Sequence, residues 1–346
     1  MVSEWRLVES LPNPWGKIPL TGGGLNPSPK VAEYMRRVVG KAAERDCVSR
    51  RHHYVPQCYL RAWSPDGRRV RALDTRNGID KLRGLRDTCV EENFYRIDHG
   101  GGPHNQAEAM FAVIDDETAR LLRTLHAWQP GDDFDFEDFM SLAMVLAFQA
   151  NRTPQVKRIM AATDRWLRTR ANQATFVTTT TGFVMLVFEA AFRAADEYSA
   201  RQLELWDDPR GGFITCDQPV QLSVDRPGHS PSMPTSARVY WPISPRRAVV
   251  LTRNLSVHKV VHRIVDRKCV DDLRSAYIRG AESVLIALPH DAALPSGKKL
   301  PRRPQLQIDC QPIAGGDRTC RVRFGRGYAS TDIDRACPTL CAMART

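Results

Sequence analysis

The sequence lacks the short motifs that mark the commonest enzyme classes. It contains no Gly-x-x-x-x-Gly-Lys loop, no Gly-x-Gly-x-x-Gly turn, no Gly-x-Ser-x-Gly elbow and no His-Glu-x-x-His pair. These motifs cradle nucleotide phosphates, expose a serine nucleophile or hold catalytic zinc. We therefore do not expect a P-loop NTPase, a Rossmann enzyme, an α/β-hydrolase or a zincin protease.

Paired cysteines and long apolar runs are also missing. No Cys-x-x-Cys occurs among the nine cysteines, and no histidine follows Cys337 and Cys341 to complete a zinc site. The longest apolar stretch, residues 182–191, contains Glu189 and is too short to span a bilayer. Residues 1–20 have no apolar core of a signal peptide. We expect a cytoplasmic chain with reduced thiols and no membrane contact.

Lysine is scarce, with 9 residues against 41 arginines, and the formal net charge is +11. Codon usage in a GC-rich genome accounts for such a ratio, and so does phosphate binding by the two-pronged guanidinium group. The excess of positive charge favours nucleic acid or another polyanion as a partner. Hydrophobic residues make up 42% of the chain, enough for a sizeable core.

Apolar periodicity predicts an α+β fold. Residues with helical spacing occupy the segments 31–45, 105–125, 136–151, 156–174, 183–205 and 270–281. Alternating or short apolar runs predict strands at 69–74, 81–87, 90–96, 213–217, 239–243, 247–252 and 283–288. We expect a bundle of long helices packed beside a small mixed β-sheet built from residues 66–96 and 213–288, with a loop at 222–236.

Composition divides the chain into three regions. Residues 1–45 are expected to form an arm with one short helix, and residues 46–294 a core domain. Residues 295–346 begin with a basic, proline-rich linker and continue into a hairpin between 305–309 and 320–324.

Residues 50–63 are the segment richest in groups that can do chemistry. Residues 52–61 read His-His-Tyr-Val-Pro-Gln-Cys-Tyr-Leu-Arg, which resembles the opening motif of the DUF4238 family of uncharacterised bacterial proteins. Three further blocks agree in order: Glu-Asn-Phe-Tyr at 92–95, Gln-Ala-Asn-Arg-Thr-Pro at 149–154, and Phe-Ile-Thr-Cys-Asp-Gln-Pro-Val at 213–220.

The resemblance covers roughly residues 50–290 and implies no established activity. Glu108 and Asp115 lie where the family tends to place two acidic residues on one helix. The chain departs from the family pattern at Cys216, where serine is usual, and near Ser275, where an asparagine is missing.

His52 and His53 are the first candidates for catalysis. Imidazole exchanges protons near neutral pH and binds metals, so one of them is a candidate base or ligand. Adjacent side chains point in different directions, so both rarely face one ligand. The alternative is a structural histidine bonded to a backbone carbonyl.

Acidic and polar groups elsewhere complete the predicted site. Glu108 and Asp115, seven positions apart, share a helix face that could hold a divalent metal ion together with a histidine and Asp217, or form a solvated stripe. Arg152 could clamp a phosphate or carboxylate, or pair with Asp217. Substrate-binding roles are assigned to four further residues: Gln57, Asn93, Tyr95 and Gln149.

Three functions remain open from the sequence. The favoured one is a nucleic-acid-directed enzyme, such as a metal-assisted phosphodiesterase in which His52, His53, Asp217 and Arg152 are catalytic. The second is a non-catalytic module that binds nucleic acid or an acidic partner. The third is a small-molecule hydrolase that uses the same polar cluster.

Overall fold

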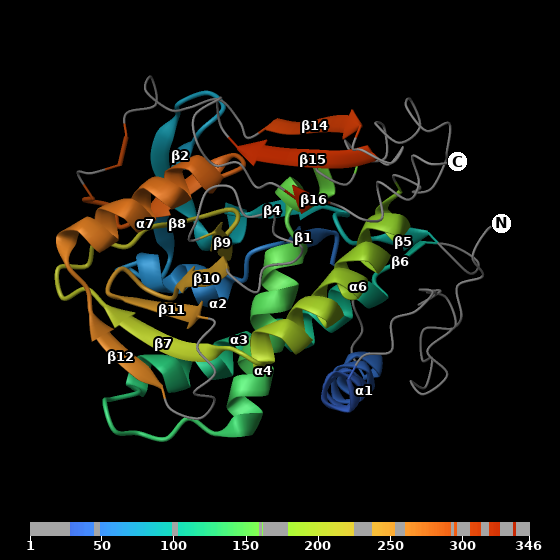
Figure 1. Ribbon diagram of the computed structural model, residues 1–346, viewed down its shortest axis with the longest axis horizontal. Helices are drawn as coiled ribbons and strands as arrows, with labels where there is room; N and C mark the ends of the chain where they lie inside the picture. The colour runs from blue at the N-terminus through green and yellow to red at the C-terminus, as the bar shows by residue number, and fades with distance from the viewer. Residues whose placement is uncertain are drawn as a thin grey trace.

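A computed structural model describes most of the chain (Figure 1). The described residues are 28–44, 49–97, 104–158, 161, 179–222, 238–252, 260–291 and 294–295, with the backbone alone of 98, 103, 223–224, 237, 305–312, 318–325 and 335–336. No helix in these ranges is long and apolar enough to cross a membrane.

The fold is α+β, as the sequence predicts. The longer helices are α1 (Pro29–Ala43), α3 (Gln106–Ala127), α4 (Phe136–Asn151), α6 (Thr180–Ser199) and α7 (Arg267–Gly280). Three short helical turns complete the helices: α2 (Gln57–Leu60) and η1 (Arg61–Trp63) begin within the histidine motif, and η2 (Leu85–Asp87) follows β3. Most of the helix expected at 156–174 lies outside the described residues.

The strands form two main sheets where the sequence predicted one. The five-stranded mixed sheet has the order β12-β7-β11-β10-β9, and only β12 and β7 are parallel. Its strands are β7 (Gln202–Asp207), β9 (Gln221–Val224), β10 (Ala237–Pro242), β11 (Arg247–Thr252) and β12 (Val261–Ile264). The four-stranded antiparallel sheet has the order β3-β2-β13-β8, with β2 (Arg69–Asp74), β3 (Asp80–Gly84), β8 (Thr215–Cys216) and β13 (Val284–Ala287).

Three smaller sheets complete the described strands. β1 (Arg51–His53) pairs with β4 (Val90–Glu92), and β5 (Ile97–Asp98) pairs with β6 (Pro103–His104). Near the C-terminus, β14 (Gln305–Pro312), β15 (Arg318–Gly325) and β16 (Arg335–Ala336) form a three-stranded sheet. The predicted hairpin is therefore confirmed.

Two sequence assignments were wrong. The helix predicted for 183–205 ends at Ser199, and residues 202–207 form β7 instead. This strand lies between β11 and β12, so its backbone is paired on both sides. The loop predicted for 222–236 begins with β9, which pairs with β10; residues 225–236 lie outside the described ranges.

Successive side chains of a strand point to opposite faces of the sheet, so the two faces pack into two different cores. In β13, Val284 and Ile286 join the large core with the helices α1, α3, α4 and α6. Leu285 and Ala287 join a smaller core against α7. Helices α1, α3, α4 and α6 therefore cover one face of the sheet that contains β13, and α7 covers the other (Figure 1).

Helix α4 is the centre of the large core. Asp135 caps its first turn by accepting a hydrogen bond from the Asp138 backbone N–H at 2.7 Å. Every residue from 139 to 149 is buried, as its apolar circumference predicts. The helix ends at Asn151, ahead of Pro154, and so delivers Arg152 to the end of a rigid element.

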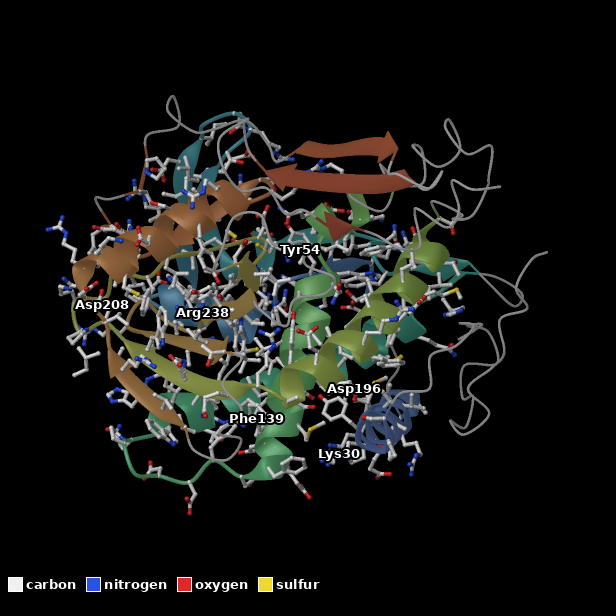
Figure 2. All side chains as sticks on the ribbon, viewed as in Figure 1. Lys30, Tyr54, Phe139, Asp196, Asp208 and Arg238 are labelled. Atoms are coloured by element: carbon white, nitrogen blue, oxygen red, sulfur yellow. The ribbon has the colours of Figure 1, made fainter. Side chains whose placement is uncertain are left out.

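Helix α1 is fastened to the bundle by a polar cap. The Ser28 hydroxyl accepts from the Val31 N–H and also contacts the Asp196 carboxylate of α6. Figure 2 labels Asp196 where α6 approaches α1. The predicted short amphipathic helix of the arm is thus confirmed, with its apolar side packed on α3. Residues 1–27 lie outside the described ranges.

Candidate functional site

His52 is a structural residue of the β1–β4 pair. Its ring is 0% exposed, and both of its nitrogens bond the backbone. Nδ1 accepts from the Tyr95 N–H at 2.9 Å, so Nε2 carries the proton and donates to the Ser49 carbonyl at 2.9 Å. Burial lowers the pKa of His52, and the Ser49 carbonyl opposes this shift. The sequence-based alternative of a carbonyl-bonded histidine fits this geometry.

His53 faces away from His52, because neighbours in a strand alternate. It pairs with Val90 across β1 and β4, and its ring lies against the carbonyls of Leu85 and Arg86. Burial lowers the pKa of His53 as well. Its Nε2 atom is buried and has no partner among the described residues. The two imidazoles therefore do not form one site.

Arg152 is the centre of a buried polar cluster at the end of α4. Its side chain is 1% exposed, and its Nη2 donates to the Asp115 carboxylate of α3 at 2.5 Å. Nε and Nη2 also donate to Gln149 Oε1, at 3.2 and 2.9 Å. Burial alone would lower the pKa of Arg152, but Asp115 raises it, so the group remains a cation.

The surrounding groups hold the guanidinium in one orientation. The Phe111 ring lies beneath it, 5.5 Å from the guanidinium carbon to the ring centroid. Tyr95 donates its hydroxyl to the Arg152 carbonyl at 2.7 Å and stacks on His52 at 5.8 Å. Gln149 donates to the Tyr54 carbonyl at 2.9 Å. The histidine motif thus reaches the cluster through Tyr95 and Tyr54, rather than through an imidazole.

One arm of Arg152 is left without a partner. Its Nη1 atom is buried and makes no hydrogen bond to any described residue. A buried unpaired donor costs about 1–3 kcal/mol, more when it is charged, so this position favours a bound water, an anion or a ligand oxygen. The cluster meets the surface at Asp115, whose side chain is 26% exposed.

Glu108 supplies a second unsatisfied group to the same cluster. It lies in the first turn of α3, and its Oε2 atom is buried without a hydrogen-bond partner among the residues that the structure describes. Burial raises its pKa to about 8, Asp115 adds to the shift, and Arg152 opposes it. Glu108 is therefore protonated at neutral pH, while its neighbour Asp115 is ion-paired. Two carboxyl groups in such different states are typical of acid–base sites.

Asp217 has a different task from the one predicted. Its carboxylate accepts from the N–H groups of Glu282, Ser283 and Val284 at 2.6 to 2.9 Å, and from the Ser283 hydroxyl at 2.7 Å. Burial raises its pKa to about 6, against the effect of these donors. It anchors the start of β13. The pairing of Arg152 with Asp217 was wrong, since Arg152 pairs with Asp115.

The block that contains Asp217 still touches the end of α4. Gln218 donates to the Ala150 carbonyl at 3.0 Å and accepts from the Thr153 hydroxyl. The Cys216 thiol donates to the Gln218 carbonyl at 3.1 Å. A serine hydroxyl at this position could donate the same hydrogen bond.

The predicted metal site is not assembled. Within the described ranges, no three His, Cys, Asp or Glu side chains are grouped as ligands of a metal ion. Glu108 and Asp115 share one face of α3, as predicted, but Asp115 is held by Arg152, and Asp217 is held by the backbone of β13. The combination with His52 fails because both of its nitrogens are occupied.

The four predicted substrate-binding residues fall into two groups. Tyr95 and Gln149 touch Arg152 directly. Asn93 is exposed and lies in a turn with φ 54°, a conformation that asparagine tolerates better than most residues. Gln57 is half-buried at the start of α2, next to Cys58, whose thiol contacts the Asp115 carbonyl at 3.6 Å.

Phe111 is a member of the cluster that sequence reasoning missed. It lies three residues after Glu108 and four before Asp115, so the helical period already placed all three on one face. An aromatic residue between two acidic residues on one helix face was the feature of the sequence that could have identified Phe111 as part of the cluster.

One of the comparisons with known proteins identifies a family. A family model described as "Protein of unknown function (DUF4238)" matches residues 51–291. The chain therefore belongs to this family, and the polar cluster at Arg152 lies inside the matched region. No curated protein and no solved structure matches the chain.

Proposed function

We propose that this chain is a hydrolase for a small phosphate ester, with Arg152 as the anion-binding group and Glu108 as the proton donor. One observation carries the proposal: two buried, unsatisfied polar atoms, Arg152 Nη1 and Glu108 Oε2, belong to one cluster. Such a pair is complementary to a group with both negative oxygens and a leaving oxygen that needs a proton.

The roles follow from the protonation states. Arg152 Nη1 would donate to a phosphoryl oxygen, and Asp115 with Gln149 would keep the guanidinium in place. Glu108 is protonated below about pH 8, so at neutral pH it can transfer its proton to the leaving oxygen as that P–O bond breaks and a water oxygen forms the new bond to phosphorus. The proton that the water loses passes to solvent, and Glu108 takes up a proton from solvent before the next cycle. Among the functions open from the sequence, this is the small-molecule hydrolase directed at phosphate.

The test uses full-length protein and diphenyl phosphate as the probe, because phenolate, whose conjugate acid has a pKa of about 10 like the tyrosine phenol, leaves poorly without a proton. We expect E108Q to lower kcat/KM at pH 7 by about 100-fold or more, the range of a lost general acid. R152K is expected to lose about 100-fold because one fixed donor is misplaced. The matched controls are E117Q, on the same helix but bonded to Arg120, and R274K, at a buried pair with Asp291.

Binding separates these roles from simple misfolding. Inorganic phosphate is expected to raise the melting temperature of wild type, E117Q and R274K, but not of R152K. EDTA is expected to leave the rate unchanged, because Asp115 and Asp217 are committed to other partners. Full activity in a folded E108Q variant would overturn the proposal.

A second candidate function is binding of nucleic acid without turnover. The net charge of +11 supports it, since polyanion binding is driven by cationic side chains and the counterions they release. For either function we propose a cytoplasmic setting, where thiols are kept reduced. Four described cysteines are free thiols: Cys58, Cys89, Cys216 and Cys269.

A further inference from the structure

The C-terminal sheet places two cysteines opposite one another. In the antiparallel pair β14–β15, Cys310 is the direct register partner of Cys320. Both residues lie outside the family match at 51–291, so no property of the family core accounts for them.

The register alone satisfies the distance that a disulfide needs. Directly opposed residues of antiparallel strands have Cα atoms about 4.5–5.5 Å apart. Disulfides join Cα atoms about 4.4–6.8 Å apart, so no change in register is required.

The cysteine pair belongs to the apolar face of the hairpin. Register pairs share a face, and faces repeat every second residue. Cys310–Cys320 therefore shares its face with the pairs Ile308–Val322 and Leu306–Phe324. The other face carries polar pairs, including Asp309–Arg321 and Gln307–Arg323.

We propose that Cys310 and Cys320 are a reversible redox site that closes into a cross-strand disulfide. The oxidant is a small disulfide of the glutathione class. One cysteine thiolate attacks a sulfur of that disulfide, and one glutathione thiolate leaves. The second cysteine thiolate then attacks the protein sulfur of the mixed disulfide and expels the second glutathione. Two protein thiols and one small disulfide become one protein disulfide and two small thiols.

The bond would fix the C-terminal sheet rather than the Arg152 cluster. It closes a loop of eleven residues, counted from 310 to 320. β16 pairs with β15 at Arg321 and Val322, so the bond lies beside the point where the third strand joins. Reduction by a thiol pool reopens the loop, which is consistent with a chain expected to keep its thiols reduced.

Trypsin makes the bond easy to locate. It cleaves after Arg318 and Arg321, so Cys310 and Cys320 fall into different peptides unless a disulfide joins them. Full-length protein is equilibrated at several ratios of oxidised to reduced glutathione, alkylated, digested and analysed by mass spectrometry. We expect a linked pair of peptides that grows with the oxidised fraction and disappears on reduction.

The matched variants are C310S and C337S. C310S is expected to lose the linked pair and to leave Cys320 alkylated, whereas C337S, another cysteine of the same C-terminal region, retains it. Alkylation of both cysteines at every glutathione ratio would overturn the proposal. A disulfide between Cys310 and any cysteine other than Cys320 would also overturn it. Release of a bound zinc ion when a thiol reagent modifies Cys310 would do the same, because the thiol would then be a metal ligand.

Discussion

At the scale of single residues, protonation states separate the two acidic side chains of α3. Glu108 is neutral up to about pH 8, and Asp115 is paired with a buried arginine. Residue types and helical spacing placed both carboxyls on one face in advance. They did not reveal the partner of Asp115, because Arg152 is 37 residues away in the chain and is brought close only by the packing of α4 on α3.

The raised pKa of Glu108 predicts a pH-dependent stability. In the unfolded chain its pKa is near 4.5, so between pH 4.5 and about 8 the folded state holds one proton more. Rising pH therefore favours unfolding, by up to about 1.4 kcal/mol per pH unit. Denaturant unfolding of wild type and E108Q should show a stability difference that shifts toward E108Q up to pH 8 and then levels off. Parallel curves for the two proteins would contradict this assignment.

His52 and His53 should differ sharply when replaced. H52A removes two backbone hydrogen bonds from a fully buried ring, which we expect to cost about 2–3 kcal/mol of unfolding free energy. H53A removes a half-buried ring and should cost clearly less. Urea unfolding measures both. A smaller loss for H52A than for H53A would show that the roles are reversed.

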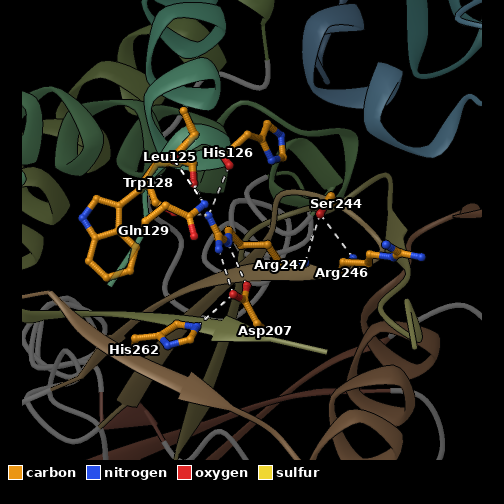
Figure 3. A network of polar contacts seen from close by, with 10 residues as sticks. Leu125, His126, Trp128, Gln129, Asp207, Ser244, Arg246, Arg247 and His262 are labelled. Carbon is orange, nitrogen blue, oxygen red and sulfur yellow. Dashed lines mark hydrogen bonds and ion pairs between the residues drawn. The ribbon is translucent and has the colours of Figure 1, made fainter. Parts of the chain in front are cut away.

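At the scale of elements, one arginine joins the end of α3 to the five-stranded sheet. Arg247 of β11 donates from Nη1 to the carbonyls of Leu125 and Trp128, at 2.7 and 2.9 Å (Figure 3). Its other nitrogens form a two-pronged pair with Asp207 of β7, at 2.7 Å each. Asp207 also bonds His262 of β12 at 2.9 Å. The network satisfies carbonyl groups at the C-terminal end of α3, the helix that carries Glu108 in its first turn.

This network predicts the effect of R247A. The change leaves helix carbonyls and a half-buried carboxylate without their cation, at a cost of about 3 kcal/mol. R246A is the matched control, since Arg246 is adjacent and exposed. Thermal or urea unfolding should show a large loss for R247A and almost none for R246A. Equal losses would mean that the network does not hold the helix end.

Element type was readable where one periodicity dominated. The all-round apolar pattern of α4 and the turn-bounded runs of β2 and β11 were recognised correctly. The boundary between α6 and β7 was missed because Leu203 and Leu205 also fit the helical spacing that precedes them. Residues 202–207 form a strand because they pair with β11 and β12, and these partners lie about 40 to 60 residues further along the chain.

At the scale of the whole molecule, the division into two sheets could not be derived. Strand β13 pairs with β2, more than 200 residues earlier, while β7 lies in the other sheet. Local periodicity carries no information about such partners. The same limit applies to the site: the sequence supplied most of its members but not their contacts.

The net charge gives a prediction for the whole chain. If nucleic acid is a partner, a fluorescent oligonucleotide should bind with an affinity that falls with salt, with a log–log slope of about −0.9 for each duplex phosphate neutralised. Fluorescence anisotropy from low to physiological salt measures this slope. Binding that is absent at low salt would remove the second candidate function.

The pH dependence of phosphate ester hydrolysis is the most direct test of the Arg152–Glu108 cluster. With diphenyl phosphate, whose phenolate leaving group needs a proton, kcat/KM of the wild type should be constant below about pH 8 and fall tenfold per pH unit above it, as Glu108 loses its proton. The residual rate of E108Q should lack this decline, and E117Q should retain it. A wild-type profile that continues level through pH 8 to pH 9.5, or one that E108Q reproduces, would contradict the assignment of Glu108 as the proton donor.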